Sequence, residues 1–360
     1  MSITSFINHP AYNMHGHFTT FARSIMWDLR IAAPAGWYFE LDANEFKCQV
    51  INVGRSVVGP EYFEFRVHQE IRISDGVPKL IYDLLKIILS DNDLFPGVGK
   101  SNRRVTVQNI FLPNYKIYDL ASPNIEDPEL DEERTKLLEL SYMMVLTFLF
   151  THEATHITDG HMSYFFSKDD SIKTINDVEF NLERHCLEVF ADTYAVLHCL
   201  DYWLEGVSVK AEIIPGKVCT NNYIIRLYIF SLFFLQRVLT TSTPVNQTYE
   251  DDLKRKHPIS AYRWGAIINT LYQELTKMKA TDMDFIEFQI GVINPIVNDL
   301  EITLDKVSIN KKDGFNNEYE RMQTYYNLEY GTALRKQYES ISHLLNQFRS
   351  RDIYKCQLWY

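Results

Sequence analysis

The segment FLFTHEATHITDGH, residues 148–161, places two histidines four residues apart, with a glutamate directly after the first. On an α-helix, residues four apart lie on one face, so the imidazoles of His152 and His156 can bind a single metal ion. Glu153 then points toward the same cleft without binding the ion. Because H-E-x-x-H on a helix is typical of zinc sites with a glutamate base, the sequence predicts one zinc ion per chain here.

The residues on both sides of this motif favour a helix. LLELSYMMVLTFLF, directly before the motif, contains neither glycine nor proline. Asp159 and Gly160, which follow the motif, are residue types that end helices. Two histidines on a helix also occur without a metal, but the adjacent Glu153 favours the metal site over this alternative.

A catalytic zinc ion normally has three protein ligands and one position left for water. The metzincin class places a third histidine where this chain has Met162, so that class is excluded. His161 lies one residue earlier, and we expect it to cap the helix end or to be exposed. The third ligand must therefore come from another part of the chain.

A second helix is predicted over residues 181–200, NLERHCLEVFADTYAVLHCL, and it carries Glu188 and Asp192 four residues apart. One carboxylate of a second helix can complete a site of two histidines, and another can accept the free N–H of a ligating histidine. We predict Glu188 as the third ligand and Asp192 as the residue that fixes a histidine tautomer. The apolar neighbours of these carboxylates indicate a largely buried helix, in which such groups need partners.

Three segments of the chain, HEATHITDGH, EVFADTYA and HPISAYR, resemble the motifs of the gluzincin metallopeptidases. They are most similar to the patterns HExxHxxxxH, ExxADxxA and HPxxxxR of the family of CaaX prenyl proteases and heat-shock membrane proteases. All three occur in that order, between residues 152 and 263. The resemblance covers these motifs and not residues 1–130 or 300–360.

The resemblance implies a role for each motif residue. It implies that the zinc ligands are His152, His156 and Glu188. It also implies that Glu153 is the general base and that His257 stabilises the transition state. Outside the resemblance, His257 can also be a loop histidine before a helix with Pro258 in its first turn. Arg263 matches the arginine of the third motif, where a structural ion pair and a catalytic role are both consistent.

Two segments, residues 142–150 and 223–239, are apolar enough to be considered as membrane spans. The first is far shorter than the ~20 residues that a bilayer requires, and the second contains Arg226, Gln236 and Arg237. We expect two buried helices and no membrane spanning. Since the best-known members of the family are embedded in membranes, the chain resembles soluble relatives, including the Lit-type peptidases associated with phage exclusion. A role in phage defence follows by that analogy alone.

The elements that must position these residues differ between the two halves of the chain. Before about residue 122, short runs with alternating or β-branched residues predict strands, and PKLIYDLLKIILSDN predicts one helix. From Glu133 onward the pattern is almost wholly helical. We expect an α+β fold, predominantly α, with a zincin-like core in which a small sheet packs on the HExxH helix. The expected regions are an α/β N-terminal region, 1–125, a zincin-like catalytic helical region, 126–300, and a C-terminal helical extension, 301–360.

Composition and charge restrict the class of protein. The chain has 360 residues, of which 46% are hydrophobic, and a formal net charge of −11 without a large basic cluster, so nucleic-acid binding is not expected. The five cysteines are widely separated and form no CxxC pair, which favours free thiols in a reducing compartment. The N-terminus lacks the pattern of a secretory signal, so we expect a cytoplasmic protein.

These residues together predict a zinc-dependent metalloendopeptidase that cleaves an intracellular protein substrate. Zinc lowers the pKa of its bound water to about 7, and Glu153 takes the proton, so that the hydroxide attacks a peptide carbonyl. Glu153 then returns the proton to the leaving amine, while His257 donates a hydrogen bond to the oxyanion. The protein or peptide substrate is expected to pair with a sheet edge, for which residues 103–111, RRVTVQNIF, are the candidate. We expect a regulatory partner, a loop or an induced closure to restrain the enzyme.

Other functions fit some of the same residues. In a non-catalytic, zinc-stabilised interaction module, the ligands would hold two helices together while a Tyr-rich surface binds a partner, but Glu153 has no task there. A zinc amidohydrolase that acts on a non-protein substrate would use the same chemistry. FPGVGKS, residues 95–101, is similar to the end of a phosphate-binding loop. However, Leu94 occupies a required glycine position and a helix precedes the segment, so an ordinary turn is preferred.

Overall fold

The computed structural model describes nine stretches of the chain. They comprise residues 36–40, 48–58, 63–74, 76–106, 127–167, 178–206, 220–239, 251–307 without 252 and 256, and 329–347.

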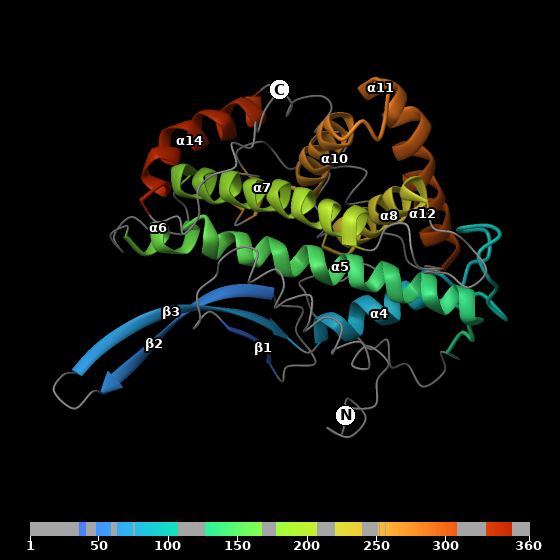
Figure 1. Ribbon diagram of the computed structural model, residues 1–360, viewed down its shortest axis with the longest axis horizontal. Coiled ribbons are helices and arrows are strands. Elements are labelled where there is room, and N and C mark those ends of the chain that lie inside the picture. The colour runs from blue at the N-terminus through green and yellow to red at the C-terminus, as the bar shows by residue number, and fades with distance from the viewer. Residues whose placement is uncertain are drawn as a thin grey trace.

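Helices make up most of the described structure (Figure 1). In chain order they are α4 Gly76–Ile88, α5 Glu132–Thr158, α6 His161–Ser167, α7 Val178–Asp201, α8 Asn221–Leu239, α10 Ser260–Lys277, α11 Phe285–Phe288, α12 Asn294–Val307 and α14 Glu329–Leu345. Two π-helical turns, η3 Tyr202–Gly206 and η4 Gln289–Ile293, follow α7 and α11. The predicted boundary at residue 300 falls inside α12.

Three backbone strands precede the helices: β1 Gly36–Glu40, β2 Cys48–Val58 and β3 Phe63–Ser74. The strand order is β1-β3-β2. β1 is parallel to β3, and β2 is antiparallel to it. Cys48 lies opposite Ile73 at one end of the β2–β3 pair, and Val58 lies opposite Phe63 at the other.

The predicted α+β fold, with a zincin-like core and a small sheet packed on the HExxH helix, is wrong for the part of the chain described in full. Apart from the three backbone strands given above, the described residues are 78% helical and form no strand or sheet. The physical reason is that the buried apolar side chains come from the helices, and α4, α7 and α8 pack along α5. Alternating runs predict local strands, but they do not show which elements form the core.

The predicted edge strand over residues 103–111 is also wrong where the structure describes it. Arg103, Arg104, Val105 and Thr106 form no strand, and residues 107–111 lie outside the described residues. The amide of Val105 instead donates to Oγ of Ser90 at 3.1 Å, directly after α4. The hydroxyl of Ser90 thus accepts the amide hydrogen of Val105, which would otherwise be donated to a neighbouring strand.

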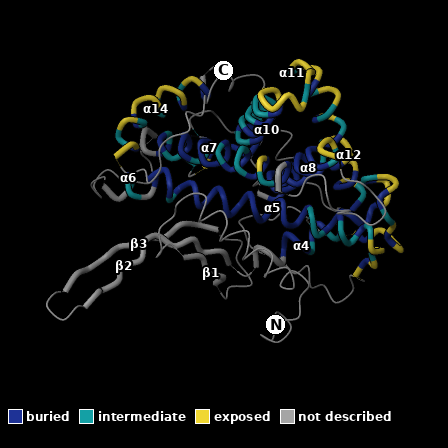
Figure 2. The backbone as a smooth tube through the Cα atoms, in the orientation of Figure 1, coloured by how far each residue is buried: buried dark blue, intermediate teal, exposed yellow. Residues whose placement is uncertain are grey.

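α5 is the central helix, and its ends are set by local signals. Asp131 caps its N-terminus by accepting the amide of Arg134 at 2.9 Å. Gly160 follows its C-terminus with φ of +73°, a backbone conformation that favours glycine. Between these ends, every residue from 141 to 156 is buried, which Figure 2 shows as a continuous dark stretch. A helix buried on all sides must be surrounded by other elements.

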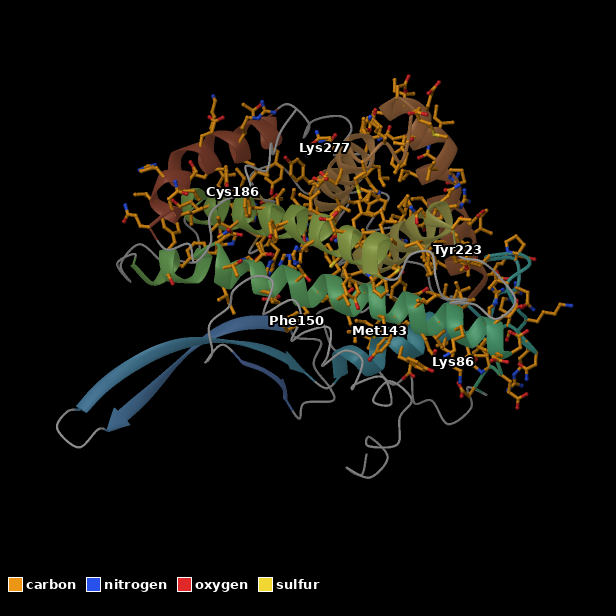
Figure 3. All side chains as sticks on the ribbon, viewed as in Figure 1. Lys86, Met143, Phe150, Cys186, Tyr223 and Lys277 are labelled. Atoms are coloured by element: carbon orange, nitrogen blue, oxygen red, sulfur yellow. The ribbon has the colours of Figure 1, made fainter. Side chains whose placement is uncertain are left out.

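The apolar runs predicted to be buried helices lie in α5 and α8. Met143 and Phe150 of α5, which Figure 3 labels, are both buried. α8 packs against α5, α10 and α12, and its residues Leu227 to Leu235 are buried without exception. Across the described helices, none combines the length and the apolar character that crossing a bilayer requires.

The loop between α4 and α5 is held by the N-terminus of α5. The amide of Gly99 donates to Oε2 of Glu133 at 2.9 Å, and the amide of Lys100 donates to Oδ2 of Asp131 at 2.6 Å. These carboxylates bind the N–H groups that a phosphate would need. The segment FPGVGKS is therefore a turn that acidic side chains of α5 and its cap stabilise, and its amides at Gly99 and Lys100 are already bonded.

Arg134 anchors the same loop from inside the core. Its side chain is fully buried and donates to the carbonyl oxygens of Leu94 at 2.7 Å and Asp91 at 3.1 Å. We expect Arg134→Met, which keeps the apolar stem, to lower the free energy of unfolding by about 3 kcal/mol, because two carbonyls lose a charged donor. Urea denaturation should show a lower midpoint with an unchanged m-value.

Lys136→Met is the matched control for this substitution. Lys136 lies two residues further along α5, where its partly exposed side chain pairs with Glu139 at 2.6 Å. An exposed pair of this kind contributes about 0–1 kcal/mol. Equal effects of the two substitutions would show that the buried guanidinium does not anchor the loop.

Candidate metal centre

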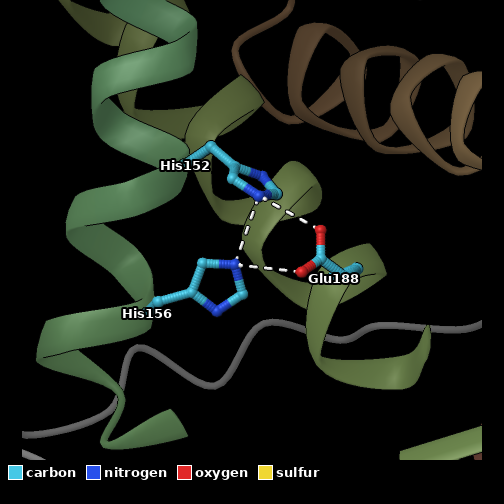
Figure 4. Close-up of side chains that lie close together, drawn as sticks. All are labelled: His152, His156 and Glu188. Carbon is cyan, nitrogen blue, oxygen red and sulfur yellow. Dashed lines mark hydrogen bonds and ion pairs between the residues drawn. The ribbon is translucent and has the colours of Figure 1, made fainter. Parts of the chain in front are cut away.

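The side chains of His152 and His156 on α5 converge with Glu188 on α7 (Figure 4). The two Nε2 atoms lie 3.2 Å apart. Nε2 of His152 lies 3.4 Å from Oε2 of Glu188, and Nε2 of His156 lies 3.6 Å from Oε1. For a tetrahedral ion bound at ~2.0–2.1 Å, two ligand atoms lie about 3.3–3.4 Å apart. The group therefore has the spacing of three ligands around one ion, and it can hold a metal.

Burial decreases across the group in one direction. His152 is 6% exposed and His156 is 8% exposed, whereas the side chain of Glu188 is 17% exposed and that of His257 is 49% exposed. Nδ1 of His257 lies 3.5 Å from Oε2 of Glu188. Solvent therefore reaches the group from the side of His257.

Asp192 supports His152 from behind. Its Oδ1 lies 2.9 Å from Nδ1 of His152, and the carboxylate is fully buried. Arg263 of α10 donates two hydrogen bonds to the same carboxylate, one from Nε at 2.6 Å and one from Nη2 at 2.7 Å. An N–H at Nδ1 leaves the lone pair of Nε2 free for an ion. Burial acts to raise the pKa of Asp192, but the Arg263 guanidinium holds that pKa below its ordinary value.

The charges of the group are matched to a cation. Burial alone would lower the pKa of His152, but hydrogen bonds to Asp192 and Glu188 raise that pKa to about 10. The pKa of Glu188 is held well below its ordinary value, against the effect of burial, by His257 and His152. Without an ion, a proton on His152 supplies the positive charge that the carboxylates require. A metal ion that binds must displace this proton.

Glu153 lies on the same turn of α5 and is 8% exposed. Burial raises the pKa of its carboxyl group to about 7, against the opposing effect of His152. A carboxyl group with this pKa can both accept and donate a proton near neutral pH. The arrangement thus places an acid–base group beside a set of metal ligands.

His161 is a member of the group that the sequence interpretation misjudged. The prediction that it caps the helix or is exposed is wrong, because it is fully buried and the cap of α5 is Asp159. α6 begins directly after Gly160, and Nδ1 of His161 lies 2.9 Å from Nδ1 of His156. His161 therefore fixes the ring of His156 as Asp192 fixes that of His152. The spacing of His152, His156 and His161 in the sequence was the signal that could have indicated this contact.

Each site residue predicted from the sequence lies in or beside this group. Arg263 binds Asp192 and also lies 4.0 Å from Glu188, so its main contact is an ion pair with a supporting carboxylate. His257 is next to Glu188 at the exposed side. The residues brought together are His152, Glu153, His156, Glu188, Asp192, His257 and Arg263.

His185 was not selected from the sequence. It lies one helical turn before Glu188 on α7 and is fully buried. Its Nε2 lies 2.8 Å from the carbonyl oxygen of Arg255, and its Nδ1 lies 2.8 Å from Oη of Tyr330 on α14. Burial lowers the pKa of His185 to about 4. The position three residues before Glu188, on the same face of the helix, was the available signal.

We expect Asp192→Asn to lower the affinity for Zn²⁺ about 10–100-fold, because the amide no longer supplies the charge that supports His152. Competition with a chromophoric chelator measures this affinity, and circular dichroism checks the fold. Asp201→Asn, at the exposed end of the same helix, is the matched control and should leave the affinity unchanged. An unchanged affinity for Zn²⁺ in a folded Asp192→Asn protein would contradict the claim that Asp192 supports metal binding by His152.

His185 should make the metal-free protein less stable in acid. Its folded pKa of about 4 lies below the ordinary 6.5, so between these values the unfolded chain binds a proton that the folded chain does not. The free energy of unfolding should therefore fall by about 2 kcal/mol more for the wild type than for His185→Gln between pH 7 and pH 5. Urea denaturation in a chelating buffer measures both curves, and parallel curves would refute the assignment.

The chain matches no known family model, no curated protein and no solved structure. Its function must therefore be argued from the geometry and the charges of this group.

Proposed function

We propose that the chain is a zinc metalloendopeptidase of the gluzincin type. The observation that carries the proposal is the convergence of His152, His156 and Glu188 at the spacing of a tetrahedral ion, with buried Glu153 beside them. Two imidazoles and one carboxylate form a ligand set that zinc favours, and hard ions such as Mg²⁺ and Ca²⁺ favour oxygen ligands. The motif resemblance to the CaaX prenyl protease and heat-shock membrane protease family supports the same assignment.

The roles of the protein groups follow from their positions. When bound, zinc supplies a Lewis acid that polarises a carbonyl and makes water a better nucleophile. Glu153 accepts the proton of the attacking water and then donates it to the leaving amine, as its pKa of about 7 allows. His257, on the exposed side of the group, donates a hydrogen bond to the developing oxyanion. Asp192 and Arg263 keep His152 in the tautomer that leaves its Nε2 available.

Two features favour catalysis over a structural zinc site. Structural sites are closed by four protein ligands, whereas the ligand group within the described residues contains three. A structural zinc site also does not need a buried carboxyl group such as Glu153, whose burial costs free energy. The open position and this acid–base group together support hydrolysis.

A protein substrate inside the cell is the substrate class that we propose. We infer that an extended polypeptide reaches the ion from the side of His257, whose side chain is 49% exposed. Cys186 and Cys199 are both free thiols, as expected in a reducing compartment. Amide hydrolysis of a small molecule uses the same chemistry, so the substrate class has to be decided by measurement.

Glu153→Gln tests the proposed function. Because the amide cannot take a proton from water, we expect proteolysis of an unfolded protein such as reduced casein to fall about 10²–10⁴-fold. Elemental analysis should still find one zinc ion per chain. Glu139→Gln, on the same helix but away from the ligands, is the control and should keep full activity.

Persistent cleavage by a metal-loaded Glu153→Gln protein would rule out the general base. An inactive wild type whose partner binding survives the substitution would instead support the interaction module. Labelling of new N-termini in lysate treated with wild type, compared with Glu153→Gln, separates protein substrates from small amides.

A further inference from the structure

The segment that carries His257 needs an anchor. His257 lies before α10, which begins at Ser260, and its side chain is 49% exposed. Its contact with Glu188 is 3.5 Å long, which is too long for a strong hydrogen bond. A loop residue held only by this contact would not keep its position relative to the ion. Other contacts of the segment must therefore fix it.

His185 provides such a contact. The carbonyl oxygen of Arg255, two residues before His257, lies 2.8 Å from Nε2 of His185. His185 lies one turn before Glu188 on α7. The same helix therefore carries Glu188 and the imidazole that binds the segment of His257. α7 thereby contributes to the distance between Glu188 and His257.

The tautomer of His185 follows from its two partners. A carbonyl oxygen only accepts, so Nε2 must carry a hydrogen that it donates to Arg255. In the neutral ring, Nδ1 is then an acceptor, and the hydroxyl of Tyr330 must donate to it across 2.8 Å. The hydroxyl of Tyr330 therefore selects the tautomer that binds the segment.

Tyr330 also contacts the other end of the motif HPISAYR. Its ring packs edge to face against Tyr262, with centroids 4.8 Å apart, and Tyr262 immediately precedes Arg263. A Cβ at Gly331 would lie 3.2 Å from Oη of Tyr262, so the absence of a side chain allows this close approach. α14 thus contacts the motif at its end and, through His185, just before its beginning.

We propose that His185 and Tyr330 are positioning residues that hold the segment of His257 against Glu188, which makes α14 part of the candidate active site. The kinetic consequence rests on the proposed function. The structural consequence, a fixed His185 tautomer and a fixed His257 ring, does not depend on it. Neither residue belongs to the group that can hold the ion, and we place the action of both at the backbone of Arg255.

Tyr330→Phe tests the proposal because it removes one hydroxyl and keeps the ring that packs on Tyr262. We expect kcat to fall about 10-fold while KM and the zinc content stay unchanged, because His257 acts on the transition state. In a His257→Ala background, the same substitution should cause no further loss. Tyr272→Phe, which removes a hydroxyl bonded to the carbonyl of Met283 at 3.2 Å, is the control and should change neither value.

A spectroscopic measurement makes the test independent of activity. In protein with ¹⁵N-labelled histidine, long-range ¹H–¹⁵N correlations should show His185 as the Nε2–H tautomer in wild type and as a mixture in Tyr330→Phe. The ring signals of His257 should shift in the same variant. Unchanged ring signals for both histidines, or an unchanged kcat despite a changed His185 tautomer, would overturn the proposal.

The two proposals can fail separately. If zinc-loaded wild type cleaves no protein or peptide, the proposed function fails, and the ring signals alone then decide the positioning. Shifted signals of His185 and His257 in Tyr330→Phe would support it, and unchanged signals would overturn it.

Discussion

The pair of carboxylates on α7, with Asp192 fully buried and Glu188 17% exposed, is the constraint on which the rest of the structure depends. Glu188 and Asp192 lie between α7 and α5, where a negative charge without a partner is costly. Arg263 balances Asp192, and His152 carries a proton between both carboxylates when no ion is bound. The contact between α5 and α7 therefore requires histidines opposite carboxylates. The packing of the central helices and the assembly of the ligand set are one interaction.

The two histidines of this set are supported differently, and this difference affects how an ion binds. His152 contacts the carboxylate of Asp192, which helps to raise its pKa to about 10, whereas His156 contacts the ring of His161. Burial lowers the pKa of His156 to about 4, so its Nε2 carries no extra proton at neutral pH. An ion that enters the group thus has one histidine proton to displace. The remaining negative charge of Glu188 and Asp192 then stabilises the ion.

The motif residues could be predicted from the sequence because their spacing within single helices determines which face they share. The HExxH helix, its end at Gly160 and the second helix with Glu188 all follow from such local rules. The core could not be predicted in this way, since alternating runs near the N-terminus do not show which elements bury α5. His185 was missed for a related reason, because its partners Arg255 and Tyr330 lie 70 and 145 residues away.

These long-range partners imply that the candidate site is stabilised as a unit. Its polar groups come from α5, α6, α7, the segment before α10, α10 itself and α14, and many of them are buried against groups of another element. A half-satisfied network of this kind is less favourable than none, because the unpaired groups keep their desolvation cost. The packing of α14 on α7 therefore stabilises the arrangement of these polar groups through the contact of Tyr330 with His185. The C-terminal helix, which carries no motif residue, is thus coupled in stability to the metal ligands on α5.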